Sequence, residues 1–209
     1  MIFTMSEYFV NAADTSAKEE NENSNILIAY FTVPEDIDTN GIDADSGASV
    51  VVKDEEVLGN MEYVALTIQD AIGGDLFRIL TEEPYGDDFD STASRAQTEL
   101  NNETRPALST HIDPEIMAGY DVIYLGFPVW WYDLPTPVWS FLEEYDLSGK
   151  TIIPFFSHNG SSNGANSLNR IAELAPEATV LTNEALSIRG SSVAGSEQQV
   201  KEWAAKFEN

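Results

Sequence analysis

The 209-residue chain contains no cysteine and only two histidines, His111 and His158. Without cysteine the protein forms no disulfide, has no thiol nucleophile and holds neither an iron–sulfur cluster nor a zinc–cysteine site. Two histidines also argue against a metal site built from several imidazole ligands. The sequence therefore predicts no metal ligand of these kinds.

Positive charge is scarce as well. The 10 Lys and Arg residues are outnumbered by 36 Asp and Glu residues, which gives a formal net charge of −26. This charge disfavours nucleic acid and anionic membranes as partners, because both would repel the chain. No apolar run is long enough to span a bilayer. Two interpretations of the acidity stay open: it favours a basic protein partner, or it only keeps the protein soluble.

The first 25 residues lack periodic hydrophobicity, and they also lack the basic start and long apolar region of a signal peptide. They are polar and acidic from Asn11 onward, which predicts an N-terminal tail over residues 1–25. The remaining residues, 26–209, are enough for one domain with a full core. We expect a cytoplasmic protein; the alternative is an exported protein whose signal is absent from this sequence.

Short apolar segments alternate with amphipathic ones along residues 26–209. The segments expected as strands are 26–31, 75–80, 122–127, 151–156, and the pair 179–181 and 185–188. Helices are expected to begin near positions 59, 91, 135, 165 and 197. This alternation predicts an α/β fold in three layers, a doubly wound, five-stranded parallel sheet with helices on both faces.

The most informative stretch runs from 121 to 146, DVIYLGFPVWWYDLPTPVWSFLEEYD. Its nearly continuous apolar start predicts a strand that is covered on both faces and stops at Pro128. Trp130 and Trp131 then fall in a loop at the carboxyl end of the strand, where parallel sheets bind ligands. We interpret these tryptophans as the wall for a flat aromatic ligand. The alternative is that one packs against the last helix while the other is partly exposed.

Two further loops are expected at the same edge of the sheet. The loop after Thr32 leads to a helix that begins at Gly59 and Asn60, where free amides and the helix dipole favour a phosphate. The loop 157–164 offers small residues whose backbone N–H groups can hydrogen-bond the edge of a ring. Alone, each loop is also compatible with an ordinary helix cap or turn. Together with the tryptophans, they predict a site for a mononucleotide with a planar ring.

Residues 33–58 form an acidic insertion between the first strand and the first helix. Its length is typical of a functional or mobile segment, and its acidity makes it a candidate docking element for a partner. Residues 50–52 are expected to form a short edge strand. The Asp-rich run from 36 to 45 has a spacing similar to that of a calcium loop. It lacks the closing Glu and the flanking helix pair, so we do not expect calcium binding.

Six segments of the chain resemble the flavodoxin family, specifically its bacterial branch with a G-[FY]-P-x-W-W loop. They are ILIAYFT, GNMEYVALTI, GDLFRIL, GFPVWW, the P-x-P-V-x-x-F-L run at 135–142, and SGKTIIPFFSHNGSSNG. The resemblance covers about residues 26–208. It implies a sheet in the strand order 2-1-3-4-5 and a non-covalently bound FMN.

The resemblance also implies which residues would bind FMN. The phosphate would be held by Thr32, Gly59, Asn60 and Met61. The isoalloxazine ring would be lined by Pro128, Val129, Trp130 and Trp131. The other side of the ring would be held by Ser157, His158, Asn159 and Gly160.

The chain departs from the family pattern at the phosphate loop. The family usually has a compact S/T-x-T-G-N-T run, whereas here residues 33–58 interrupt it and Met61 replaces the last hydroxyl. The departure removes one phosphate ligand. We hypothesise that Ser46 or Ser49 folds back to replace it.

For two side chains near the predicted flavin site, His158 and Tyr85, two roles stay open. His158 would act as a proton donor beside the flavin, or it would only hydrogen-bond the backbone or contact solvent. Tyr85 would contact the cofactor, or it would only cover the sheet.

By this resemblance the protein would carry electrons between protein partners with FMN as its cofactor, and its acidity would favour a basic redox partner. Two alternatives stay open: an NAD(P)H-dependent FMN or quinone reductase on the same fold, and a flavin-free binding module of flavodoxin fold. No catalytic side chain and no metal ligand is predicted, and the sequence leaves the oligomeric state open.

Overall fold

The computed structural model describes residues 25–33, 49–53, 56–86, 89–160 and 164–207. Several subjects of the sequence predictions lie outside these ranges. They are the N-terminal tail except for Asn25, residues 34–48 of the acidic insertion with its Asp-rich run and Ser46, and residues 161–163 of the loop 157–164.

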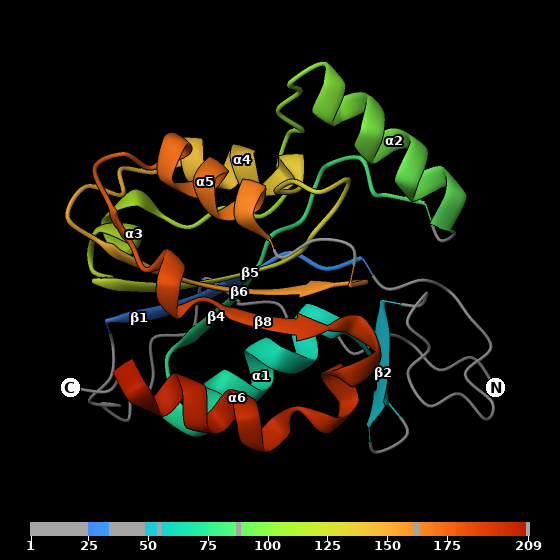
Figure 1. The fold of residues 1–209 in the computed structure, drawn as a ribbon. Helices are drawn as coiled ribbons and strands as arrows, with labels where there is room; N and C mark the ends of the chain where they lie inside the picture. Colours follow the sequence, from blue (N-terminus) through green and yellow to red (C-terminus); the bar gives the residue numbers. More distant parts are fainter. Residues whose placement is uncertain (1–24, 34–48, 54–55, 87–88, 161–163, 208–209) are drawn as a thin grey trace, which may run out of the picture.

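The main sheet is parallel throughout and confirms the predicted α/β fold (Figure 1). Its strands follow the spatial order β4 (Asp75–Arg78), β1 (Ile26–Tyr30), β5 (Val122–Pro128), β6 (Thr151–His158) and β7 (Thr179–Val180). β8 (Leu186–Arg189) pairs with the second half of β6, beyond β7, so β7 and β8 share one position in the sheet. Numbered along the chain, the five positions read 2-1-3-4-5, as the family resemblance implies.

Helices cover both faces of this sheet (Figure 1). One face carries α1 (Asn60–Ile72) and α6 (Glu197–Ala204). The other face carries α2 (Phe89–Asn101), α3 (Pro114–Ala118), α4 (Thr136–Glu144) and α5 (Ala165–Leu174). Three 3-10 helices belong to the C-terminal part: η1 (Thr182–Glu184), η2 (Gly190–Gly195) and η3 (Ala205–Phe207). Among the described helices, none has both the length and the apolar character needed to cross a membrane.

The strands divide their side chains between two cores. Along β1, Leu27 and Ala29 pack with α4 and α5, whereas Ile28 and Tyr30 pack with α1 and α6. β5 and β6 are buried on both sides in the same way, because helices cover both faces of a parallel sheet. This double burial explains the continuous apolar sequences of these strands.

The acidic insertion contains a second sheet of two strands. β2 (Val50–Lys53) pairs antiparallel with β3 (Glu56–Gly59), so the segment expected as an edge strand forms a hairpin apart from the main sheet. Val51 packs into the core beside α1, which gives the hairpin a buried side. β3 continues directly into α1, and the Asn60 amide donates to the Ser49 carbonyl at 2.8 Å. The hairpin therefore fixes the position at which α1 begins.

Candidate functional site

The carboxyl ends of β1, β5 and β6 lie side by side (Figure 1). Phe31, which follows β1, donates its amide to Gly126 of β5 at 2.9 Å. Pro128 is in register with Ser157, and the Val129 amide donates to the Ser157 carbonyl at 2.8 Å. The structure therefore brings the starts of the three predicted loops to one edge of the sheet.

Thr32 meets the beginning of α1. Its side chain occupies the space in which a Cβ on Gly59 would lie, since such an atom would be 2.3 Å from Thr32 Oγ1. Only glycine permits this close approach without a shift of Thr32. The Thr32 hydroxyl makes no hydrogen bond to another residue in the described part of the chain. It is therefore available at a helix N-terminus, where an anion is favoured.

Two amides at the start of α1 already have partners. The Asn60 amide donates to the hairpin, and the Gly59 amide donates to the Glu62 carboxylate at 3.2 Å. Met61 is 1% exposed, so its side chain packs in the core where the family pattern has a hydroxyl. Of the predicted phosphate ligands, the Thr32 hydroxyl and the Met61 amide thus remain as donors. Sequence reasoning did not foresee that the insertion itself would use one of these amides.

The Asn60 side chain supplies a test of whether FMN fits this end of the site. Asn60 is 5% exposed, and its Oδ1 has no hydrogen-bond partner among the described residues. A buried acceptor without a donor costs about 1–3 kcal/mol. FMN carries hydroxyl groups next to its phosphate, and one of them could donate here. Ser49 also lies at this end, and its contact with α1 is made by its carbonyl rather than its hydroxyl.

Charges near the start of α1 are mixed. Glu62 Oε1 lies 3.8 Å from Arg78 Nη1. Burial, and then the Glu62 charge, raises the pKa of the Tyr30 hydroxyl to about 12, so Tyr30 stays neutral. The Arg78 guanidinium therefore offsets part of the negative charge that an incoming phosphate would meet.

Trp130 is half-buried and is held by two aromatic neighbours. Its ring packs edge-to-face on Phe31 and on Tyr85, with centroid separations of 5.2 Å and 5.1 Å. The backbones of Trp130 and Asp133 exchange hydrogen bonds of 3.2 Å and 2.9 Å. The loop is thereby closed into a tight turn that fixes Trp130 next to β1.

The two residues after Trp130 adopt an uncommon backbone conformation. Trp131 and Tyr132 have φ angles of 48° and 65°, in the left-handed region that bulky residues rarely adopt. Their exposed fractions are 43% and 55%. The Trp131 indole donates to the Ala93 carbonyl of α2 at 2.8 Å. The tryptophans thus diverge: Trp130 packs toward the core and Trp131 lies against α2, on the side of the sheet opposite to α6.

A buried polar cluster next to Trp130 escaped the sequence reasoning. Glu99 of α2 accepts hydrogen bonds from Tyr85 Oη at 2.5 Å and from Thr136 Oγ1 at 2.7 Å, and it pairs with Arg95 Nε at 2.7 Å. The Arg95 guanidinium lies 4.1 Å from the Tyr85 ring centre. Burial raises the pKa of Tyr85, and the hydrogen bond to Glu99 adds to this effect. Tyr85, held by its hydrogen bond to Glu99, therefore packs against Trp130 in a fixed position. In the sequence, the only sign of this cluster is the i,i+4 spacing of Arg95 and Glu99.

The third predicted segment lies at the end of β6. Ser157 is buried, His158 is half-buried, and Asn159 and Gly160 are exposed. His158 Nδ1 accepts a hydrogen bond from the Gly160 amide at 2.9 Å. Burial, and then the Arg189 charge, lowers the pKa of His158. The imidazole is therefore neutral near pH 7 with its proton on Nε2. It hydrogen-bonds the backbone at Gly160, which is one of the two roles predicted for it.

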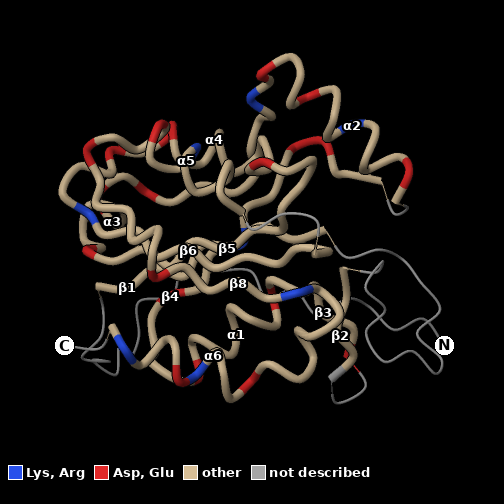
Figure 2. The backbone as a smooth tube through the Cα atoms, viewed as in Figure 1, with Lys and Arg blue, Asp and Glu red and all other residues tan. Residues whose placement is uncertain are grey.

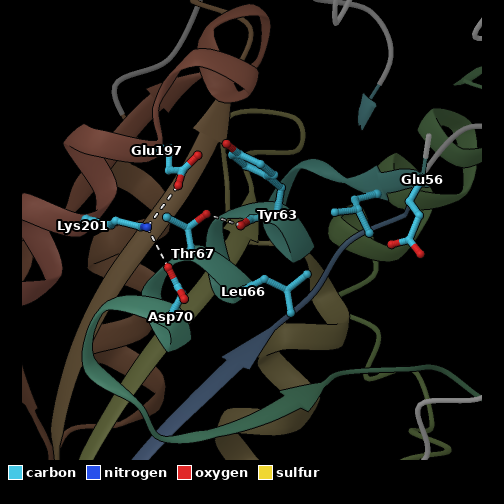
Figure 3. A pocket seen from close by; sticks show the side chains of 8 residues that line it. Glu56, Tyr63, Leu66, Thr67, Asp70, Glu197 and Lys201 are labelled. Atoms are coloured by element: carbon cyan, nitrogen blue, oxygen red, sulfur yellow. Dashed lines mark hydrogen bonds and ion pairs between the residues drawn. The ribbon is translucent and has the colours of Figure 1, made fainter. Parts of the chain in front are cut away.

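A separate groove of about 310 Å³ lies between α1, α6 and the hairpin (Figure 3). It is lined by Glu56, Leu58, Tyr63, Leu66, Thr67, Asp70, Glu197 and Lys201. The Lys201 ammonium is already engaged by Asp70 at 2.6 Å and by Glu197 at 3.1 Å. The groove is therefore acidic and lies in a helical layer, so it does not suit a phosphate-bearing ligand.

Comparison with a family model described as flavodoxin gives a match over residues 49–207. This range is most of the chain and includes the start of α1, the double-tryptophan loop and the segment after β6. The chain therefore belongs to the flavodoxin family. A search of curated proteins gives no significant match.

Solved structures with the same fold span nearly the whole chain. A Bacteroides eggerthii protein described as a flavoprotein is 26% identical, with a TM-score of 0.61 over 88% of this chain and 97% of that one. A similar protein from Bacteroides uniformis is also 26% identical, with a TM-score of 0.62 over 87% and 97%. A flavoprotein in complex with FMN from Lactobacillus acidophilus is 19% identical, with a TM-score of 0.54 over 83% and 98%. At this last identity the similarity shows the fold alone.

Proposed function

We propose that the protein binds FMN and carries electrons between protein partners. The observation that carries the proposal is that the starts of the three predicted loops lie at one edge of the sheet, in a chain of the flavodoxin family. A flavoprotein of the same fold from Lactobacillus acidophilus was crystallised in complex with FMN, which supports the choice of cofactor.

The side chains at this edge suggest how FMN would be held. The Thr32 hydroxyl and the Met61 amide would bind the phosphate, and Asn60 Oδ1 would accept a hydrogen bond from a ribityl hydroxyl. Trp130 would line one side of the isoalloxazine ring, and the segment 157–160 would hydrogen-bond the edge of the ring. FMN supplies the redox chemistry by accepting and releasing electrons, whereas the protein orients it and tunes its potential.

The surface supports a protein as the redox partner. Acidic residues occur in both helical layers and basic residues are few (Figure 2), so a basic partner would be attracted. Trp131 and Tyr132 are 43% and 55% exposed in the loop that would line the ring. Exposed aromatic side chains are enriched in protein interfaces. We propose that a basic redox partner docks over these two residues.

A visible absorption spectrum of the purified protein, before and after addition of FMN and gel filtration, tests cofactor binding. We expect flavin bands that elute with the protein. The FMN-loaded protein, reduced anaerobically and freed of reductant, should then reduce a basic haem protein such as cytochrome c. The rate should fall as salt concentration rises, because screening weakens attraction between opposite charges.

Two outcomes would contradict this function in different ways. Flavin-dependent consumption of NADH or NADPH that is faster than electron transfer to the haem protein would indicate a reductase. A protein that takes up no FMN would indicate a flavin-free binding module. A rate of haem reduction that does not respond to salt would remove the argument for a basic partner.

A further inference from the structure

Arg189 is an exposed cation at the carboxyl edge of the sheet, in a chain where cations are few. The other arginines of the described part and Lys201 each pair with a carboxylate. Lys150 donates to backbone carbonyls. Arg189 has no carboxylate partner among the residues that the structure describes. In a protein with 36 acidic residues, this leaves its charge available to the adjacent site.

β8 places Arg189 next to the segment 157–160. Arg189 is in register with His158 of β6. Its guanidinium lies against Gly160, since a Cβ on that glycine would be 3.3 Å from Arg189 Cζ. Gly160 has a φ of 96° and no side chain, so the guanidinium sits directly on the backbone. The Arg189 charge also contributes to the lowered pKa of His158, which indicates that its field reaches this segment.

We infer that Arg189 stabilises the negative charge that a bound FMN ring gains on reduction, and that it thereby raises the midpoint potential of the flavin. The inference rests on the proposed function. Uptake of two electrons and one proton adds one negative charge to the ring, and nearby protein charge tunes that step. The electrons come from a reduced protein partner, or from dithionite in the test below, and the proton comes from solvent.

Two electrostatic effects act against each other at this edge. The net charge of −26 disfavours a further negative charge, but exposed charges beyond about 10 Å are largely screened by salt. Arg189 instead acts at close range, through the backbone of the segment that would hold the ring, where Coulomb interactions are stronger. His158 adds no second positive charge here, because its Nδ1 accepts from the Gly160 amide. Arg189 is therefore the positive charge that lies against this segment.

The test compares Arg189→Gln with Lys206→Gln in the full chain. Both remove one positive charge from an exposed side chain, but Lys206 belongs to η3, which follows α6 and contacts the first half of β5 through Phe207 and Tyr124. The Kd of oxidised FMN is measured by fluorescence quenching, and the midpoint potential by equilibration with a reference dye at low salt.

We expect Arg189→Gln to weaken the binding of reduced FMN about tenfold relative to oxidised FMN, which equals about 30 mV for a two-electron couple. Lys206→Gln should leave this ratio nearly unchanged. Arg189→Lys keeps the charge and should retain most of the native potential, which separates the charge from the shape of the guanidinium.

Each other result overturns the inference in a distinct way. An unchanged ratio in Arg189→Gln, or an equal shift in Lys206→Gln, would refute the role of Arg189 while FMN binding stands. If Arg189→Gln weakens the binding of oxidised and reduced FMN equally, Arg189 contributes to FMN binding but does not respond to the charge that the ring gains on reduction. A native protein that takes up no FMN would remove the proposed function, and the inference with it.

Discussion

The two ends of the candidate FMN site are built in different ways. At the phosphate end, the hairpin and Glu62 take two amides of α1, and the Thr32 hydroxyl and the Met61 amide remain as donors. At the ring end, Trp130 is fixed by edge-to-face packing and by the bonded cluster around Glu99. The comparison indicates that contacts with the ring, rather than with the phosphate, would supply most of the affinity for FMN.

The acidic insertion explains this difference. Residues 33–58 replace the compact phosphate loop of the family, and the described part folds as a hairpin that docks on α1. A hairpin at a helix start must satisfy its own backbone groups, so the Ser49 carbonyl takes an amide that a ligand could have used. The ring end has no insertion, and its sequence keeps the GFPVWW pattern.

The largest effect is expected at the ring end, from Glu99→Ala. The change removes the partner of Tyr85, Thr136 and Arg95 at a position where Glu99 is 8% exposed. Loss of a buried charged partner costs about 3 kcal/mol, and urea unfolding should record this loss. Glu177→Ala removes an exposed carboxylate and should change the free energy of unfolding by less than about 0.5 kcal/mol. Equal losses in the two variants would show that the cluster gives the ring end no special support.

The next largest effect is expected at the phosphate end, from Gly59→Ala. The new Cβ would lie 2.3 Å from Thr32 Oγ1, so either the side chain or the backbone must move. Overpacking of this kind costs about 2 kcal/mol, which thermal unfolding can measure. Gly195→Ala is the matched control, because nothing lies within 4 Å of its added Cβ. If the two variants are equally stable, the phosphate end is adaptable rather than tightly packed, and the contrast between the two ends weakens.

The sequence predicted the sheet and the place of the double-tryptophan loop at the carboxyl end of β5, because both depend on local patterns. The apolar run of β5 is long enough to predict a strand that is buried on both faces of the sheet. The alternation of strands and helices is compatible with only a few topologies. Both were confirmed. The hairpin could not be predicted, because β3 (Glu56–Gly59) lacks alternating hydrophobicity and is stabilised as a strand only by its pairing with β2. The short strand at 50–52 was expected, but its pairing with β3 was missed.

The support beneath the ring loop was hidden for a different reason. Glu99 has the same sequence context as any exposed acid of an amphipathic helix, and its burial depends on Tyr85 and Thr136, which are 14 and 37 residues away. Such contacts exist only once the fold is complete. The assignment of individual FMN ligands stays a prediction.

Thr32→Val tests the phosphate end directly. The change keeps the shape of the side chain and removes the hydroxyl that remains available beside α1. A hydrogen bond to a charged group is worth about 1.5 kcal/mol or more, so FMN should bind about tenfold more weakly. Riboflavin, which has no phosphate, should bind as before, and fluorescence titration measures both. Equal weakening of both ligands would assign Thr32 a packing role only.

No change in either affinity would mean that the phosphate is held elsewhere. The next hypothesis to test is that the hydroxyl of Ser46 or Ser49 replaces the phosphate ligand that is missing at Met61. Ser46→Ala combined with Ser49→Ala should weaken FMN but not riboflavin if that hypothesis holds. Unchanged FMN affinity in the double variant would contradict it.

The smallest effect concerns the pH dependence of stability at the ring end. Burial, and then the Arg189 charge, lowers the pKa of His158 in the folded protein. On acidification the unfolded chain therefore binds a proton first, so protonation favours unfolding. The contribution of neutral His158 is present above its ordinary pKa of about 6.5 and is lost as the pH falls through the lower folded value. Exposed His111 has the opposite sign, because its hydrogen bond to Glu144 raises its pKa.

Urea unfolding between about pH 5 and pH 8 separates the two histidines. His158→Gln should flatten the loss of stability on the acid side. His111→Gln should remove a contribution that is present at low pH and is lost as the pH rises through the folded pKa of His111. A native acid-side slope that survives in His158→Gln would show that the imidazole is not held neutral by its surroundings. At low pH the ring end would then carry the positive charges of both Arg189 and His158. Its charge would differ from that of the phosphate end, where Glu62 lies, by more than the structure indicates.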